Sequence, residues 1–144
     1  MLVSQMLKSK PELGLISVKP DATVADAAKL LSQNRIGTVV VSEDGATLVG
    51  ILSERDIVRE LGKRGAGCLG DPVTALMTSE LITCKPSNTA LEVLEIMTNG
   101  RFRHLPVKDG QEIIGLISIG DAVKGRLAQL AMEKASLEGM IMGY

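Results

Sequence analysis

The chain has 144 residues, of which 45% are hydrophobic and 23% charged, so it holds enough apolar material for the core of a folded globular protein. Its 16 basic and 17 acidic residues leave a net charge of −1, and no strong global field attracts it to nucleic acid or to an anionic membrane. Aromatic residues make up only 1% of the chain, which removes the stacking platforms that hold single-stranded nucleic acid.

Few residues of this chain could serve a metal site or a catalytic centre. Cys68 and Cys84 are too few for a disulfide framework, and with one histidine they cannot assemble a zinc site. No Ser-His-Asp or Cys-His pattern has a supporting context, and no Gly-Lys-Ser/Thr follows the glycines at 62–67, as a P-loop requires. We therefore expect no enzyme, no metal and no required cofactor.

The hydropathy pattern and the cysteine content predict the cellular compartment and whether the chain spans a membrane. The N-terminal segment MLVSQMLKSK lacks the continuous apolar region of a signal peptide. No apolar run approaches the roughly 20 residues that span a bilayer. Two unpaired cysteines suit a reducing compartment. These features predict a cytoplasmic protein without a nucleic-acid or membrane partner.

The first predicted helix belongs to a segment that occurs twice. Residues 18–34 lie over residues 84–100 at a spacing of 66. Both copies repeat apolar residues at i, i+3, i+4 and i+7, which predicts an amphipathic helix in each. The positions are Val24, Ala27, Ala28 and Leu31 in the first copy and Ala90, Val93, Leu94 and Met97 in the second.

A predicted hairpin follows the helix in each copy. In the first copy, residues 38–41 and 48–52 form apolar runs around an Asp-Gly turn, and residues 104–107 and 113–117 match them in the second. Pro106 cannot donate a backbone hydrogen bond, so it predicts an edge strand or a strand end. Between the copies, the glycine-rich stretch 62–67 predicts a mobile linker, followed by a helical turn at residues 73–77.

Each copy ends in a helix that a Ser-x-x-Asp sequence opens, at residues 53–56 and 118–121. Each half therefore predicts the order strand, helix, strand, strand, helix. We expect an α/β protein, more closely an α+β sandwich of two βαββα repeats, at residues 1–66 and 67–144. The second repeat carries a long C-terminal helix that reaches about Leu137. A single copy is marginal as a free domain, so the two are expected to pack together.

The repeated sequences GILSERDIV (50–58) and GLISIGDAV (115–123) resemble the G-h-h-[ST]-x-x-D signature that closes CBS domains, which occur in pairs. The entries Val18-x-Pro and Cys84-x-Pro agree with this resemblance, which covers about residues 3–127. It implies a pseudo-twofold pair, also called a Bateman module. It further implies a stand-alone regulatory function, in which AMP, ADP, ATP, NAD or S-adenosylmethionine binds in clefts between the repeats. The alternative is a structural interaction module whose clefts are degenerate.

The chemistry of the second Ser-x-x-Asp suits such a ligand. Ser118 precedes a helix whose first amides carry partial positive charge, and Asp121 can accept hydrogen bonds from ribose hydroxyls. The same two residues also fit an ordinary helix cap with a first-turn acid, and the two roles are compatible. Similarity to the AMP-activated kinase regulatory subunit implies that Arg103 and His104 face phosphates. Their alternatives are a surface cation and a structural histidine.

The first copy departs from this pattern, because Gly37 and Thr38 replace the Arg-His pair, while Arg55 lies within its Ser53–Asp56 sequence. In the family, a cleft combines Ser and Asp of one repeat with the entry strand of the other. The apolar residues of both clefts could sandwich an adenine, with plain core packing as the alternative. The cleft of Ser118 and Asp121 would use Ile16, Val18, Ile36 and Gly37, and that of Ser53 and Asp56 would use Ile82, Cys84 and Phe102. We expect the phosphate in the cleft with Arg103.

The helices also predict self-association. Leu127, Leu130 and Leu137 lie on one side of the C-terminal helix, and a two-layer sandwich has few faces left to bury them. Exposed stripes of this kind usually mark association surfaces. We expect a homodimer closed through the helices of both repeats, and a target protein that the sequence does not identify.

Overall fold

The computed structural model describes residues 1–10 and 15–142, which pack into two compact units. The unit that we call the Ser53 unit contains the described parts of segments 13–82 and 110–114. The Ser118 unit contains those of segments 1–12, 83–109 and 115–144. Each unit is described by itself. These units are sets of packed segments, so the repeat boundary between residues 66 and 67 stays a prediction.

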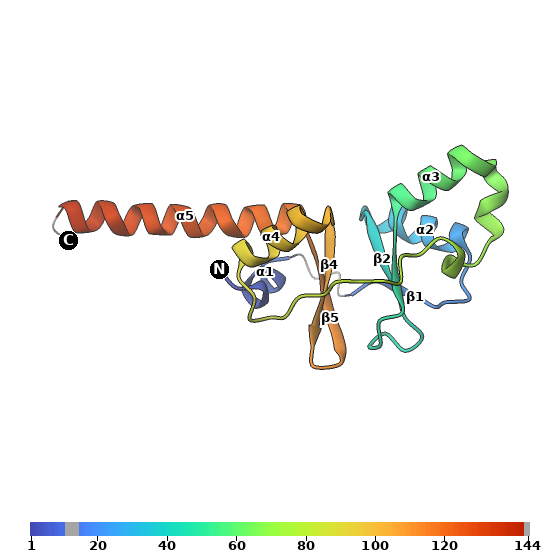
Figure 1. Cartoon of the computed structure of the whole chain (residues 1–144), viewed down its shortest axis with the longest axis horizontal. Helices are drawn as coiled ribbons and strands as arrows, with labels where there is room; N and C mark the ends of the chain where they lie inside the picture. The colour runs from blue at the N-terminus through green and yellow to red at the C-terminus, as the bar shows by residue number, and fades with distance from the viewer. Residues whose placement is uncertain (11–14, 143–144) are drawn as a thin grey trace. The chain divides into compact units, whose positions relative to one another are not determined.

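The Ser53 unit has a three-stranded sheet covered by helices (Figure 1). Its elements are β1 (Ser17–Val18), α2 (Val24–Asn34), β2 (Thr38–Val41), β3 (Gly50–Ser53) and α3 (Glu54–Arg64). The central strand β2 runs parallel to β1 and antiparallel to β3, with Val39 opposite Leu52. All residues of β2 are buried, as expected for a central strand. The predicted order strand, helix, strand, strand, helix is confirmed here.

Helix α2 forms where the apolar stripe predicts it, with the stripe facing the core and a cap at its N-terminus. Val24, Ala27 and Leu31 are buried in the core of the Ser53 unit. Thr23 caps the helix, since its hydroxyl accepts a hydrogen bond from the Asp26 amide at 3.1 Å, and the Asp26 carboxylate accepts one from the Thr23 amide at 3.1 Å. The apolar period and the cap together fix which face of the helix meets the sheet.

The predicted mobile linker at residues 62–67 is wrong. Helix α3 continues to Arg64, and a 3₁₀ helix (Gly65–Gly70) follows directly. Arg64 forms ion pairs with Glu60 and Asp71, and Cys68 is completely buried. These contacts hold a glycine-rich segment in helical form although its composition favours a loop. The helical turn predicted after it is present as a 3₁₀ helix, Val73–Ala75.

The Ser118 unit joins the N-terminal helix to the second half of the chain. Its elements are α1 (Val3–Lys8), α4 (Ala90–Gly100), β4 (His104–Asp109), most of β5 (Glu112–Ser118) and α5 (Ile119–Met142). Strands β4 and β5 pair with each other. The predicted entry strand of this copy shrinks to one parallel bridge between Cys84 and Val107. Pro106 lies in β4, where its carbonyl accepts a hydrogen bond from the Cys84 amide at 2.9 Å.

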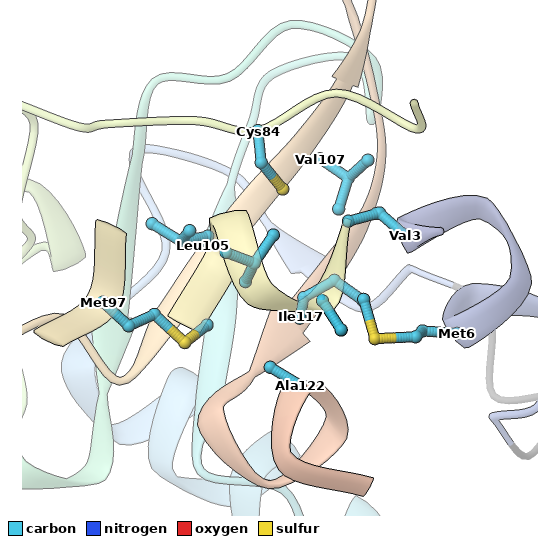
Figure 2. Packing of buried hydrophobic residues seen from close by; sticks show 10 residues of the cluster. Val3, Met6, Cys84, Met97, Leu105, Val107, Ile117 and Ala122 are labelled. Atoms are coloured by element: carbon cyan, nitrogen blue, oxygen red, sulfur yellow. The ribbon is translucent and has the colours of Figure 1, made fainter. Parts of the chain in front are cut away.

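Two residues of α1, Val3 and Met6, pack into the core of the Ser118 unit (Figure 2). They meet side chains that lie far along the sequence. The other members of this core are Cys84, Ala90, Val93, Met97, Leu105, Val107, Ile117 and Ala122. The N-terminal segment therefore belongs structurally to the unit that contains the second Ser-x-x-Asp sequence.

Helix α5 is longer than predicted, reaching Met142 instead of about Leu137. Its first turns pack against α4 and α1, with Ala122 and Gly125 buried. After Leu130 the residues up to 142 are exposed, apart from the partly covered Gly139. This part of α5 extends past α1 and α4 (Figure 1). Within the described residues, no helix is long and apolar enough to cross a membrane.

Candidate functional site

Both Ser-x-x-Asp sequences form helix caps, which confirms the capping interpretation. The Asp56 amide donates to the Ser53 hydroxyl at 3.2 Å, and the Ser53 amide donates to Asp56 Oδ2 at 2.9 Å. The corresponding distances for Ser118 and Asp121 are 3.1 and 2.9 Å. Each cap uses the Oδ2 oxygen of the carboxylate, and the Oδ1 oxygen takes no part in this pair of bonds.

The two carboxylates differ in the cation that neutralises each. Asp121 Oδ2 lies 2.9 Å from the ammonium nitrogen of Lys10, which also donates to the Leu116 carbonyl at 2.8 Å. Asp56 instead has Arg59, from its own helix, at 3.6 Å on Oδ1. In the part of the chain that the structure describes, Asp121 Oδ1 accepts no hydrogen bond. Asp121 therefore keeps one free acceptor oxygen beside a fixed cation.

The charge state of Asp121 follows from these contacts. Partial burial disfavours the ionised carboxyl, but the hydrogen bond from the Ser118 amide and the ion pair with Lys10 outweigh this effect. The pKa of Asp121 therefore lies below its ordinary value. The side chain is an anionic acceptor at neutral pH.

The backbone places Arg103 next to the start of α5. The Ile119 amide, in the first turn of α5, donates to the Arg103 carbonyl at 2.9 Å. The same bond recurs in the Ser53 unit, where the Glu54 amide donates to the Gly37 carbonyl at 2.8 Å. Arg103 is exposed, and it adjoins Ser118 and Asp121 through this bond. The matching place beside Ser53 holds only a glycine.

His104, Thr38 and Arg55 differ from one another in how deeply they are buried. His104 begins β4 and is half-buried, while Thr38 begins β2 and is buried. Arg55 is exposed in the first turn of α3. A ligand role for His104 and Arg55 stays a prediction.

The apolar residues predicted to sandwich an adenine lie mostly in or against the cores. Val18 and Cys84 are core residues, and burial raises the pKa of the Cys84 thiol to about 11. Ile16 and Ile36 pack against the core of the Ser53 unit, and Phe102 packs against that of the Ser118 unit. Ile82 is 49% exposed. Core packing thus accounts for most of these positions, and their contact with a ligand stays a prediction.

The Ser53 unit contains an open cavity of about 490 Å³ between α2 and the start of α3. Its walls are mainly apolar, and they include two predicted site residues, Ile36 and Gly37. The lining is completed by Ala28, Leu31, Ser32, Arg35, Glu54, Ile57 and Val58.

Lys10 is the residue that inspection of the sequence missed. Its signal was a second, shorter repeat, in which VSQML at residues 3–7 lies over VTALM at residues 73–77. In the structure these segments have equivalent places. A β-carbon on Gly115 would lie 2.6 Å from Leu7 Cδ2, and one on Gly50 would lie 2.7 Å from Met77 Sδ. The segment near the start of each repeat therefore packs on a glycine that opens a Ser-x-x-Asp signature, and this packing brings Lys10 close to Asp121.

Comparisons with known proteins agree with this architecture. The family model for the CBS domain matches residues 7–63 and 73–127. The mitochondrial CBS domain-containing protein CBSX3 of Arabidopsis thaliana is 34% identical over 98% of this chain and 72% of its own length. The solved CBS-domain containing protein ATU1752 from Agrobacterium tumefaciens is 39% identical with a TM-score of 0.81, covering 88% of this chain and 99% of its own.

A further solved structure, CBSX2 in complex with AMP, is 30% identical with a TM-score of 0.72, covering 88% of this chain and 96% of its own. Two matches of the family model account for most of the chain. The fold, the repeated Ser-x-x-Asp caps and these similarities lead to one conclusion: the chain belongs to the CBS-domain family, as a tandem pair.

Proposed function

We propose that the protein is a cytoplasmic regulatory module, not an enzyme, which binds an adenosine-containing ligand at the start of α5. The observation that carries this proposal is the state of Asp121. Its carboxylate is ionised and fixed through Oδ2, while Oδ1 accepts no hydrogen bond within the described residues. A carboxylate that is held through one oxygen and has its other oxygen available suits the two hydroxyls of a ribose. The backbone of Arg103 is hydrogen-bonded to the first turn of α5, and its guanidinium carries a donor fork that suits a phosphate.

The ligand class rests on similarity as well as chemistry. CBSX2, which shares the fold and 30% of its sequence with this chain, was solved in complex with AMP. AMP, ADP, ATP, NAD and S-adenosylmethionine all carry the adenosine ribose that Asp121 would recognise. No required cofactor enters this proposal, and binding would act on a separate target protein.

A thermal-shift panel tests this function. AMP, ADP, ATP, NAD, NADH and S-adenosylmethionine are added to the full chain, with inorganic phosphate as the control that lacks a ribose. A ligand at a hundred times its Kd stabilises the folded state by about 2.7 kcal/mol, which raises the Tm by several degrees. If no nucleoside compound raises the Tm at millimolar concentration, the alternative of a structural interaction module with degenerate clefts replaces the proposal.

We further propose that the protein works as a homodimer closed through its helices. In α5, exposed apolar side chains recur at spacings of four, three, seven and four residues. This is the spacing of a coiled-coil seam, in which Lys134 would hold the one polar position. The seam consists of Val123, Leu127, Leu130, Leu137 and Ile141. In the Ser53 unit, Val58 is 65% exposed at the apolar cavity between α2 and α3. A second copy would bury these surfaces.

Light scattering tests the dimer. We expect about twice the 15.2 kDa chain mass at tens of micromolar. Leu137→Glu places a charge in the seam and should shift the protein toward monomer. Met132→Glu is the matched control, since Met132 is 70% exposed and lies off the seam. A wild-type monomer, or equal effects of both substitutions, would contradict an α5 interface.

A further inference from the structure

The cation beside Asp121 is Lys10, from a distant segment, whereas the cation beside Asp56 is Arg59 of its own helix. When VSQML is aligned with VTALM, Lys10 corresponds to Glu80. Lys10 holds Asp121 at 2.9 Å, whereas Glu80 is exposed and forms no ion pair within the described residues. The acid Glu54 also follows Ser53 directly, where Ile119 follows Ser118. One site thus gains a cation where the equivalent position of the other carries an acid.

The Lys10 ammonium is held in place from two sides. Leu7 lies against Gly115, while Val3 and Met6 anchor α1 in the core of the Ser118 unit. The ammonium nitrogen then donates to Asp121 Oδ2 and to the Leu116 carbonyl, at 2.9 and 2.8 Å. Its side chain remains 36% exposed. Helix α1, which two buried residues anchor, thus places the partly exposed Lys10 that follows it at the carboxylate.

Among the residues that the structure describes, the Lys10 ammonium has a hydrogen-bond donor left over. A lysine ammonium has three donors, and two of them are used by Asp121 and Leu116. The remaining donor can bind a ligand oxygen without breaking either contact. Asp121 Oδ1 supplies an acceptor on the same carboxylate. An acceptor and a donor side by side suit a ligand that combines hydroxyls with an anionic oxygen.

Charge explains why Lys10 should matter most for anionic ligands. A bare Asp121 carboxylate repels a phosphate and would offset the attraction of Arg103. Lys10 neutralises that carboxylate and leaves Arg103 in excess. The same cation should contribute little to the binding of an uncharged nucleoside.

We propose that Lys10 contacts the ligand and determines the selectivity of the Ser118–Asp121 site, binding a phosphate oxygen of a phosphorylated adenosine ligand through its free N–H donor. This inference rests on the proposed function and assigns the N-terminal segment to the binding site.

Calorimetric titration of the full chain with AMP and with adenosine tests it. Lys10→Gln should weaken AMP binding about tenfold, the loss of one charge-assisted hydrogen bond, and adenosine binding less than about threefold. Lys10→Glu, which copies the residue of the other repeat, should weaken AMP binding further. Lys10→Arg should retain AMP binding, since it keeps the charge. Lys8→Gln removes an exposed lysine two residues away and should change neither affinity.

The outcomes separate the two proposals. If the wild type binds AMP and Lys10→Gln binds it with the same affinity, the role of Lys10 is overturned and the proposed function is retained. Equal losses for AMP and adenosine in Lys10→Gln also overturn it, because they indicate a structural effect. Failure of the wild type to bind either compound overturns both the role of Lys10 and binding of AMP at this site. The Tm of each variant is measured alongside, and a selective loss of AMP binding at an unchanged Tm supports the proposal.

Discussion

The starts of α3 and α5 share one local sequence and one cap, yet their surroundings differ. Each serine and aspartate exchange the same pair of hydrogen bonds. Beside α5 lie Arg103 and Lys10, whereas beside α3 lies Gly37, and α3 itself begins with the acid Glu54. The cap is a local property that any such sequence can form. What a site can bind depends on the residues that other segments bring to it.

The largest difference between the two sites is expected on removing their carboxylates. Asp121→Ala should weaken binding of AMP and adenosine by up to about a hundredfold, since it removes the ribose acceptor. Asp56→Ala is the matched control. Both substitutions break a capping box and should cost about 1 kcal/mol of folding stability, but we expect Asp56→Ala to affect AMP binding less. Titration calorimetry with urea unfolding measures both quantities, and equal affinity losses would contradict unequal sites.

A second difference lies in the glycine that opens each signature. A β-carbon on Gly50 would lie 2.8 Å from the Thr78 carbonyl oxygen, which is fixed because Ile51 and Thr78 exchange two backbone hydrogen bonds. One on Gly115 meets Leu7 Cδ2, the flexible end of a side chain, at 2.6 Å. Gly50→Ala should therefore destabilise the protein by about 2 kcal/mol and Gly115→Ala by less. Urea midpoints at constant m-value test this order, and the reverse order would refute it.

Arg103 sharpens the comparison of charge. Arg103→Ala should weaken AMP binding about tenfold and leave adenosine binding nearly unchanged, because only the phosphate contact is lost. Arg55→Ala removes the exposed cation of the other predicted site and should weaken AMP binding less, because the phosphate is expected beside Arg103. If AMP binds equally well to the wild type and to Arg103→Ala, Arg103 does not belong to the site.

The smallest effect concerns the turns of the two hairpins. The Asp44 carboxylate accepts hydrogen bonds from the Thr47 and Ala46 amides, which lower its pKa to about 2. Because the pKa in the folded state lies below the unfolded value of about 3.9, these bonds stabilise the protein above that pH. Their contribution is lost as the pH falls through about 2.

Asp44→Asn should therefore reduce stability slightly at pH 6 and flatten its dependence on pH between about 4 and 2. Asp109→Asn, at the end of β4 where the other hairpin turns, is the control, since within the described residues the Asp109 carboxylate accepts no such backbone hydrogen bonds. Chemical unfolding across this pH range measures both variants. An unchanged profile in Asp44→Asn would assign the acid sensitivity to other carboxylates.

Much of the architecture could be predicted from local patterns. The apolar stripe at Val24, Ala27 and Leu31 and the Asp-Gly turns predicted elements that the structure confirms, because both signals act within a few residues. The linker prediction at residues 62–67 failed because glycine content reports local preference. The ion pairs of Arg64 and the burial of Cys68 were decisive there.

The sequence by itself determined the repeats, the two capped helix starts and the family. Each of these depends on motifs of a few residues that recur at regular positions. Only the tertiary structure decided that Lys10 meets Asp121, a contact between residues 111 positions apart. It also decided that Val18 and Cys84 serve the cores. The physical reason is that burial and ion pairing depend on which segments pack together, and no local spacing encodes the packing of α1 on α5.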